Sequence, residues 1–166
     1  MDWKFTSEKD LVNTFNNTID PFWEEQVSRG HFAGKGDVDV HYAWCIPDTP
    51  RSTIVISSGR IESYLKYKEL VFDLYQNGFA VFILDHRGQG LSGRMTHDPQ
   101  HGYVAHFDDY VDDLVYFTQN IVVPKQQGRL QLLCHSMGGA IGALTLLRLP
   151  TLFSKAVLAS PMFGIK

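Results

Sequence analysis

The chain has 166 residues, of which 44% are hydrophobic and 20% are charged, and its formal net charge at pH 7 is −3. This length suffices for one domain with a substantial core, and this composition is typical of a globular protein. The small negative charge excludes the basic surface that a nucleic-acid-binding domain requires. The two cysteines, Cys45 and Cys134, are too few for a disulfide framework, and we expect Cys134 to be a buried thiol.

The first residues do not read as a secretory signal, because Met1 to Phe5 contain no basic start followed by an apolar stretch. No apolar run reaches the roughly 18 residues that a membrane-spanning helix needs. We therefore expect a cytoplasmic protein that can also lie peripherally on the inner membrane.

The N-terminal segment, residues 1–30, is expected to be helical and to precede a domain that occupies residues 31–166. Apolar residues recur at helical spacing over residues 7–29, and we expect Pro21 to divide this helix into two pieces. The aromatic pair Phe22-Trp23 can dock on a membrane or on the domain, and we favour the domain.

The domain is expected to begin with an antiparallel hairpin. Residues 31–36 and 38–46 read as its two strands, because apolar and polar residues alternate in the second one. Further apolar runs, typical of buried strands, alternate with helical segments and lie at residues 53–57, 79–84, 129–133 and 155–159. This alternation predicts an α/β fold in which a mostly parallel sheet carries helices on both faces.

Four carboxylates, those of Asp108, Asp109, Asp112 and Asp113, stand near the start of the helix predicted over residues 107–121. Such a cluster can indicate a metal site, but the helix dipole also favours carboxylates at a helix N-terminus. We interpret the cluster as a solvated acidic helix start, and we expect neither a metal nor another cofactor.

The clearest chemical signal is the turn at Ser136, which follows the apolar run at residues 129–133 and precedes a helix rich in small residues. A serine at a sharp strand-to-helix turn is the nucleophile elbow of an acyl hydrolase, usually written G-x-S-x-G. Here Cys134 occupies the first position, and we expect this small residue to fill the space that the usual glycine occupies. The Met137 N–H, at the helix N-terminus, then faces the oxygen that becomes negative during acyl transfer.

Several motifs of the chain together resemble one family. In chain order they are the loop SSGRIESYLKY, the turn DHRGQGLSGR, the helix HFDDYVDDL, the elbow CHSMGG and the closing SPMFGIK. In this order and spacing they are similar to the bacterial lysophospholipase L2 group of the α/β-hydrolase superfamily, near the monoacylglycerol lipases. The similarity runs from about Val38 to Lys166.

This resemblance implies an α/β-hydrolase fold and hydrolysis of the acyl ester of a lysophospholipid or a monoacylglycerol, with release of a fatty acid. By position, Ser136 is then the nucleophile, and the backbone N–H groups of Met137 and Arg60 are the oxyanion donors. In α/β-hydrolases the acid and the histidine of the triad follow the nucleophile in the chain. We therefore expect the chain to hold only the N-terminal part of the fold, without the lid and the C-terminal strands.

Other interpretations of the elbow stay open. His135 and His86 are alternative bases, but we expect His135 to be a packing residue on the opposite side of the turn. We expect His86 to belong to a structural turn that Asp85 and Arg87 hold in place. The chain can also be an inert truncation or an interaction module, or a peptidase or thioesterase. Half of a hydrolase sheet would expose a strand edge and an apolar helix face.

Overall fold

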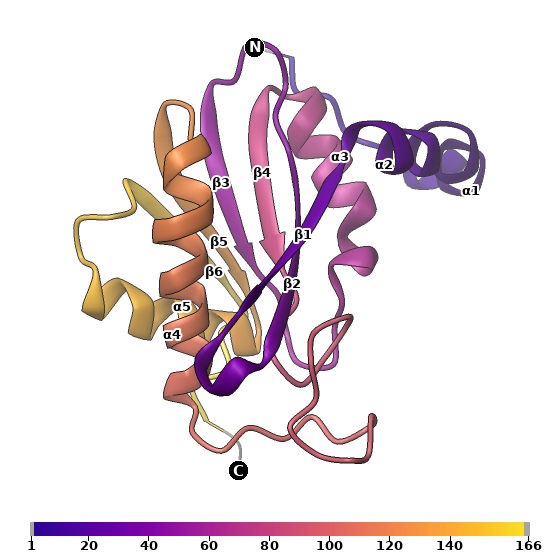
Figure 1. Ribbon diagram of the computed structural model, residues 1–166. Coiled ribbons are helices and arrows are strands. Elements are labelled where there is room, and N and C mark those ends of the chain that lie inside the picture. Colours follow the sequence, from indigo (N-terminus) through magenta and orange to yellow (C-terminus); the bar gives the residue numbers. More distant parts are fainter. Residues whose placement is uncertain (1, 165–166) are drawn as a thin grey trace.

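In the computed structural model, which describes residues 2–164, one sheet of six strands separates two layers of helices (Figure 1). The strands are β1 (Ser28–Ala33), β2 (Asp39–Cys45), β3 (Ser52–Ser57), β4 (Phe79–Leu84), β5 (Arg129–His135) and β6 (Lys155–Ala159). Their order is β1-β2-β4-β3-β5-β6. β2 pairs antiparallel with β1 and with β4, and the other pairs are parallel. The predicted α/β fold, an antiparallel hairpin leading into a mostly parallel sheet, is confirmed. The first hairpin strand, predicted over residues 31–36, lies earlier, at Ser28–Ala33, because Lys35–Asp37 form a helical turn.

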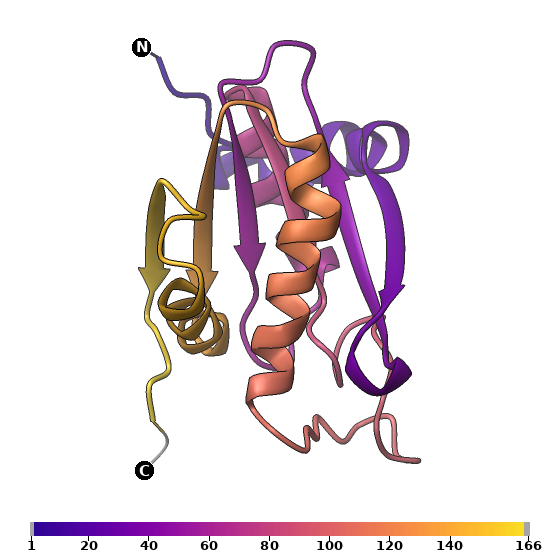
Figure 2. The same ribbon diagram turned by 60° about the vertical axis from the view of Figure 1, so that its left-hand side comes forward.

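Helices cover both faces of the sheet, with α4 and α5 on one side and α2 and α3 on the other (Figure 2). Their bounds are α1 (Leu11–Thr14), α2 (Asp20–Gln26), α3 (Lys68–Gln76), α4 (Asp108–Tyr116) and α5 (Met137–Arg148). Successive strand residues point to opposite faces. Phe82 and Leu132 therefore pack in the core under α4 and α5, whereas Val81 and Ile83 pack in the core under α3.

The middle strand, β3, explains where a site can form. All its residues are buried, because β4 and β5 flank it and helices cover both faces, and its β-branched residues 53–56 suit this position. Since β3, β4, β5 and β6 run parallel, the chain leaves all four at the same edge of the sheet. The loop of residues 58–63, the turn of residues 85–93 and Ser136 follow these strands there. Ligand sites of open α/β sheets lie at this edge.

The N-terminal segment differs from its prediction at Pro21 and at its end. The helix is not divided at Pro21, because the π-helical turn Phe15–Ile19 runs directly into α2. This wider turn makes room for a proline ring that would otherwise meet the carbonyl of the preceding turn. The predicted helical range, residues 7–29, is also too long, since α2 ends at Gln26 and the chain pairs with β2 from Ser28 onward.

Docking of the aromatic pair onto the domain is confirmed. Phe22 is 8% exposed and Trp23 is fully buried. The ring centroid of Phe22 lies 5.3 Å from that of Phe72 and 4.8 Å from that of Tyr75 on α3. The ring centroid of Trp23 lies 6.0 Å from that of Tyr64, with the two rings tilted. The N-terminal segment therefore contributes to the hydrophobic core on the α3 face.

The prediction of a solvated acidic helix start is wrong for Asp109 and Asp113, which are 6% and 1% exposed. Arg87, itself buried, donates from Nε and Nη2 to the two oxygens of Asp113 at 2.6 and 2.7 Å. Lys35 Nζ lies 2.8 Å from Asp109 Oδ1. These carboxylates tie the turn after β4 and the hairpin to α4. Within residues 2–164, no group of His, Cys, Asp and Glu side chains is arranged to hold a metal ion.

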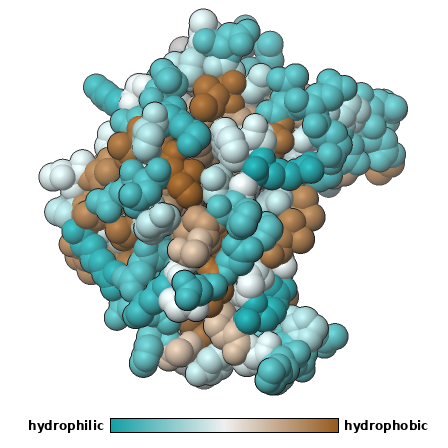
Figure 3. All heavy atoms as spheres, in the orientation of Figure 1, coloured by the Kyte–Doolittle hydropathy of each residue, from teal (hydrophilic) through white to brown (hydrophobic). Residues whose placement is uncertain are grey.

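The expected exposed strand edge and apolar helix face are both present. β6 is an edge strand, and its Val157 is 58% exposed. On α5, Leu144 and Leu147 are exposed, and with Phe107, Met162 and neighbouring small residues they line a groove. Figure 3 shows apolar side chains gathered on this flank of the molecule. None of the helices formed by residues 2–164 is both long and apolar enough to span a bilayer.

The buried Arg87–Asp113 pair predicts a large effect of removing one partner. We expect Asp113→Asn to lower the free energy of unfolding by about 3 kcal/mol, because buried Arg87 loses its two short hydrogen bonds to a carboxylate and keeps only the ion pair with Asp109 at 3.7 Å. Asp112→Asn is the control on the same helix, since Asp112 is half-exposed and pairs with Arg148, and it should cost less than about 1 kcal/mol. Urea unfolding measures the free energy of unfolding of both variants. Equal losses of stability in the two variants would contradict the prediction.

Candidate active site

The backbone of Ser136 is strained. β5 ends at His135 and α5 begins at Met137, so the chain reverses from strand to helix within one residue. Ser136 takes φ 51° and ψ −118°, a conformation that side-chain-bearing residues rarely adopt. Such a conformation costs about 1–3 kcal/mol and persists only where its surroundings enforce it. The predicted strand-to-helix turn at Ser136 is therefore present.

Three backbone hydrogen bonds hold this turn. The Ser136 N–H donates to the carbonyl of Ala159 at the end of β6 at 3.0 Å. The Ser136 carbonyl accepts from the N–H of Gly139 and from the N–H of Met162, both at 2.9 Å. The turn is thus bonded on one side to its own helix and on the other to β6 and the segment after it. The closing motif of the chain, SPMFG, contributes directly to the geometry of Ser136.

Gly138 allows α5 to begin against the end of β3. A Cβ atom at Gly138 would clash with the backbone carbonyls of Ser57 and Ser58. Neither carbonyl can move without breaking the end of a buried strand. Gly138 therefore permits the close approach of the two backbones, because it has no side chain.

Cys134 is a buried thiol, as expected, and burial raises its pKa to about 12. Its side chain points at Gly142 on α5, where a Cβ atom would clash with Cys134 Sγ. The space for the sulfur therefore comes from Gly142, one turn after the elbow glycines. The sequence alone does not reveal this pairing, because the two residues meet only when α5 folds back on β5.

The two predicted oxyanion donors lie on adjoining segments. Met137 is the first residue of α5, so its N–H has no intrahelical acceptor. Arg60 lies in the loop after β3, and within residues 2–164 its N–H donates to no acceptor. A Cβ on Gly59 would lie 3.0 Å from His135 Nδ1, so this loop passes directly beside the elbow. Two free backbone donors thus occur at the same edge of the sheet as Ser136.

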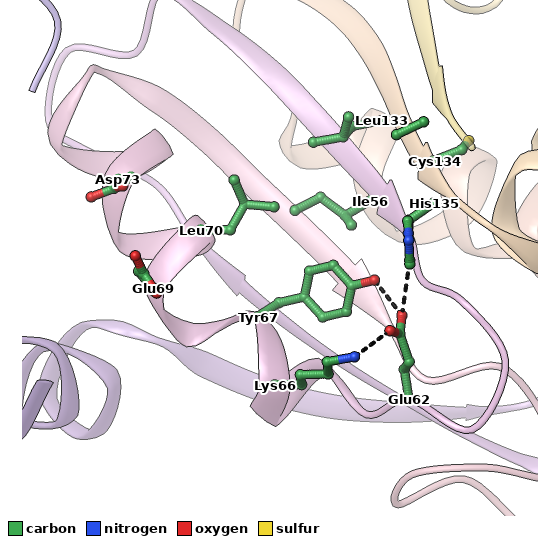
Figure 4. A pocket seen from close by; sticks show the side chains of 11 residues that line it. Ile56, Glu62, Lys66, Tyr67, Glu69, Leu70, Asp73, Leu133, Cys134 and His135 are labelled. Atoms are coloured by element: carbon green, nitrogen blue, oxygen red, sulfur yellow. Dashed lines mark hydrogen bonds and ion pairs between the residues drawn. The ribbon is translucent and has the colours of Figure 1, made fainter. Parts of the chain in front are cut away.

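Glu62 fixes the shape of the loop that carries Arg60. Its Oε2 accepts from the Gly59 N–H at 2.7 Å and from the Tyr67 hydroxyl at 2.5 Å, and its Oε1 accepts from Lys66 Nζ at 2.6 Å. His135 Nδ1 lies 3.4 Å from Oε2 (Figure 4). Burial raises the pKa of Glu62, but these hydrogen bonds outweigh burial and lower it to about 2. Sequence reasoning missed Glu62.

Gln89 holds the same loop from the opposite side. Its Nε2 donates to the carbonyls of Gly59 at 2.7 Å and Glu62 at 3.1 Å, and its Oε1 accepts from the Ile61 N–H at 3.0 Å. Ile61 itself has φ 58°, a strained value for a β-branched residue. The loop is therefore held rigidly between the turn after β4 and Glu62, with the Arg60 N–H left free.

Neither nearby histidine reaches the Ser136 hydroxyl. His86 is fully buried, its Nε2 lies 2.9 Å from Ser57 Oγ, and burial lowers its pKa to about 4. The predicted structural role of His86 is confirmed. His135 is not the packing residue we expected: its side chain is 47% exposed and it faces Glu62. Among residues 2–164, no hydrogen bond joins Ser136 Oγ to a side chain.

Two grooves flank the loop that carries Arg60. One, about 440 Å³, lies over β3 and β5 beside α3, and Ile56, Leu70 and Leu133 form its floor (Figure 4). The other, about 530 Å³, lies between this loop and the turn after β4 and contains Arg60 and Arg94. Ser136 lines neither groove.

The comparison with protein families identifies the chain. A family model described as "Serine aminopeptidase, S33" matches residues 48–166. The chain belongs to this family. Lysophospholipase L2 of Escherichia coli K12 is 43% identical over 99% of the chain, and monoglyceride lipase of Rattus norvegicus is 34% identical over 72%. The chain spans 48% of the length of the first relative and 38% of the second.

Solved structures agree on the fold. A probable hydrolytic enzyme from Pseudomonas aeruginosa superposes with a TM-score of 0.68 at 21% identity, covering 82% of this chain and 41% of the other. A putative lipase from Acinetobacter baumannii superposes with a TM-score of 0.66 at 17% identity, covering 89% of this chain and 46% of the other. The chain therefore has the fold of the N-terminal part of an α/β-hydrolase.

The contact between Cys134 and Gly142 predicts a coupled pair of substitutions. Gly142→Ala alone is expected to destabilise the chain by about 1–3 kcal/mol through overpacking against the sulfur. Adding Cys134→Ala removes the clashing atom, so the double variant should be more stable than Gly142→Ala alone. Gly102→Ala is the control, because open space surrounds Gly102. Additive losses in denaturant unfolding would show that the two residues do not share this space.

Glu62 predicts a dependence of stability on acid. Its pKa is about 2 in the folded chain against 4.5 ordinarily, so its contribution is complete above about pH 5 and is lost as the pH falls toward 2. We expect Glu62→Gln to lower the free energy of unfolding at pH 7 by roughly 1–3 kcal/mol, and by less at pH 3. Urea unfolding at both pH values checks this, with the exposed Glu25→Gln as control. A loss independent of pH would contradict the assignment.

Proposed function

We propose that the site belongs to a serine ester hydrolase of the lysophospholipase type, which releases a fatty acid from a lysophospholipid through an acyl-enzyme on Ser136. The observation that carries this proposal is the strained backbone of Ser136 between β5 and α5, because it matches the turn that exposes a nucleophilic serine in acyl hydrolases. The similarity to a lysophospholipase and to monoglyceride lipases supports a lipid ester as the substrate.

In the proposed reaction, Ser136 Oγ attacks the carbonyl carbon of the acyl ester, and a base takes the hydroxyl proton. The carbonyl oxygen becomes an oxyanion that accepts hydrogen bonds from the backbone N–H groups of Met137 and Arg60. The ester C–O bond then breaks, and the glycerophosphodiester leaves with the proton. Water attacks the acyl-enzyme in the same way and releases the fatty acid, which restores Ser136.

We further propose that the base comes from outside residues 2–164. Within these residues the ring of His86 faces Ser57 and the ring of His135 faces Glu62, and no hydrogen bond joins either ring to Ser136 Oγ. A serine hydroxyl without a base is a weak nucleophile at neutral pH. The acid and base of the reaction are therefore expected from a part of the enzyme corresponding to the second half of the relatives.

A lipid substrate would reach the site from a membrane surface or a micelle. We propose that the protein is cytoplasmic and contacts the inner membrane peripherally. The exposed side chains of Leu147 on α5 and Phe163 after β6 line one apolar groove, and this surface can contact lipid.

Labelling with a fluorophosphonate tests the proposed nucleophile. We would join residues 1–166 to the corresponding second half of E. coli lysophospholipase L2 and follow labelling by intact mass. We expect one label per chain in this chimera and none after Ser136→Ala. The 166-residue chain alone should label at least about 10³-fold more slowly, because the base is absent.

Ser160→Ala provides the matched control, since Ser160 is an exposed serine near the elbow with a similar positive φ of 46°. Labelling should not depend on it. Labelling that survives Ser136→Ala would refute Ser136 as the nucleophile. Fast labelling of the 166-residue chain would refute an external base. A folded chimera that neither reacts with the probe nor hydrolyses lipid esters would favour the alternative that the chain is an interaction module.

A further inference from the structure

Two arginines without carboxylate partners line the groove beside the loop that carries Arg60. This groove, about 530 Å³ in volume, lies between residues 60–63 and residues 88–94, with Pro99 and Tyr110 on its walls. We call it the Arg60–Arg94 groove. In the part of the chain that the structure describes, neither guanidinium lies within ion-pair distance of an acidic side chain. The positive charge of the Arg60–Arg94 groove is therefore not neutralised by an ion pair within the described residues.

The guanidinium of Arg94 is fixed in place by the backbone. Nε donates to the Pro99 carbonyl at 2.9 Å, Nη2 donates to the Gly90 carbonyl at 3.0 Å, and Nη1 donates to the Ser92 carbonyl. These acceptors are neutral, so they orient the side chain and leave its full charge. Arg94 thus supplies a positive charge at a defined point in the groove wall.

Arg60 is exposed and free to bind. Tyr110 lines the same groove: burial raises the pKa of Tyr110, and the positive charges of Arg60 and Arg87 oppose that rise. Glu62 also lines the groove, but Lys66 and Tyr67 already engage its carboxylate. A planar guanidinium with free N–H groups is the side chain best suited to a phosphate.

We infer that the Arg60–Arg94 groove binds the phosphodiester of a lysophospholipid headgroup and so makes the site prefer lysophospholipids over monoacylglycerols. The inference rests on the proposed function, because it places the ester carbonyl at the Arg60 N–H. Only the glycerol unit separates that carbonyl from the phosphate in a lysophospholipid. An ester bound at the backbone of Arg60 therefore has its phosphate within reach of the side chain of the same residue. A monoacylglycerol presents a neutral hydroxyl there.

Binding to the 166-residue chain tests the groove without requiring any reaction. In a Ser136→Ala background, calorimetric titration would compare a short-chain lysophosphatidylcholine below its micelle concentration, a monoacylglycerol with the same acyl chain, and inorganic phosphate. We expect the lysophospholipid to bind about tenfold more tightly than the monoacylglycerol, through charge-assisted hydrogen bonds. Arg60→Gln should abolish this difference, and Arg60→Lys should restore part of it.

Arg129→Gln is the matched control, because Arg129 is an exposed arginine at the start of β5, at the opposite edge of the sheet. It should leave the difference between the two lipids unchanged. Equal binding of both lipids, no binding of either, or equal losses from Arg60→Gln and Arg129→Gln would overturn the inference. Inorganic phosphate that binds as tightly as the lysophospholipid would make the groove a free-phosphate site and overturn the headgroup assignment.

The two proposals can fail separately. Absence of fluorophosphonate labelling at Ser136 would refute the proposed reaction, but a binding preference that depends on Arg60 would still identify a phosphate-binding groove. Conversely, a chimera that labels at Ser136 and hydrolyses both lipids with equal kcat/KM would support the reaction and refute the headgroup groove.

Discussion

The site depends on the backbone hydrogen bonds that hold Ser136 at φ 51°. A residue in this conformation would relax if its neighbours allowed it, since the strain is worth a substantial part of a typical domain stability. The carbonyl of Ala159 and the N–H of Met162 prevent this relaxation from the β6 side, and Gly139 prevents it from the α5 side. The elbow is therefore a property of three adjoining elements, and the short motif around Ser136 would not produce it in isolation.

The loop that carries Arg60 is also held in place by contacts from neighbouring segments. A free N–H is useful as an oxyanion donor only if it is held at a fixed point, because catalysis by such donors requires that they need no reorganisation. Glu62 and Gln89 bind the N–H groups of Gly59 and Ile61 and the carbonyls of Gly59 and Glu62, and they leave the Arg60 N–H unused. Glu62 also lies beside His135, the residue before the nucleophile. A single buried carboxylate thus links the two segments that would surround an oxyanion.

The sequence predicts the parts of this structure that depend on residues close together in the chain. The strand-helix alternation, the turn at Ser136 and the buried Cys134 follow from hydrophobic periodicity and turn chemistry. Apart from the N-terminal helix, where a local π-helical turn precedes Pro21, the errors and omissions involve distant partners. Asp113 is buried because Arg87 reaches it from the turn after β4, and Cys134 fits because Gly142 leaves space. Glu62 and His135 lie 73 residues apart, and nothing in either segment alone signals their contact.

The proposed ester hydrolysis requires two functions, stabilisation of an oxyanion and transfer of a proton, and these have different structural requirements. Stabilising the oxyanion needs backbone donors at the carboxyl ends of adjacent parallel strands, and β3 and β5 present both candidates within the described residues. Moving a proton needs a histidine that approaches Ser136, and the two nearby histidines of the described residues face Ser57 and Glu62. Because the proposed oxyanion donors follow the buried central strands of the sheet, these donors can be rigid without the remainder of the enzyme. In this proposal the base is supplied from another direction, which lets substrate-binding and proton-transfer elements vary without disturbing the elbow.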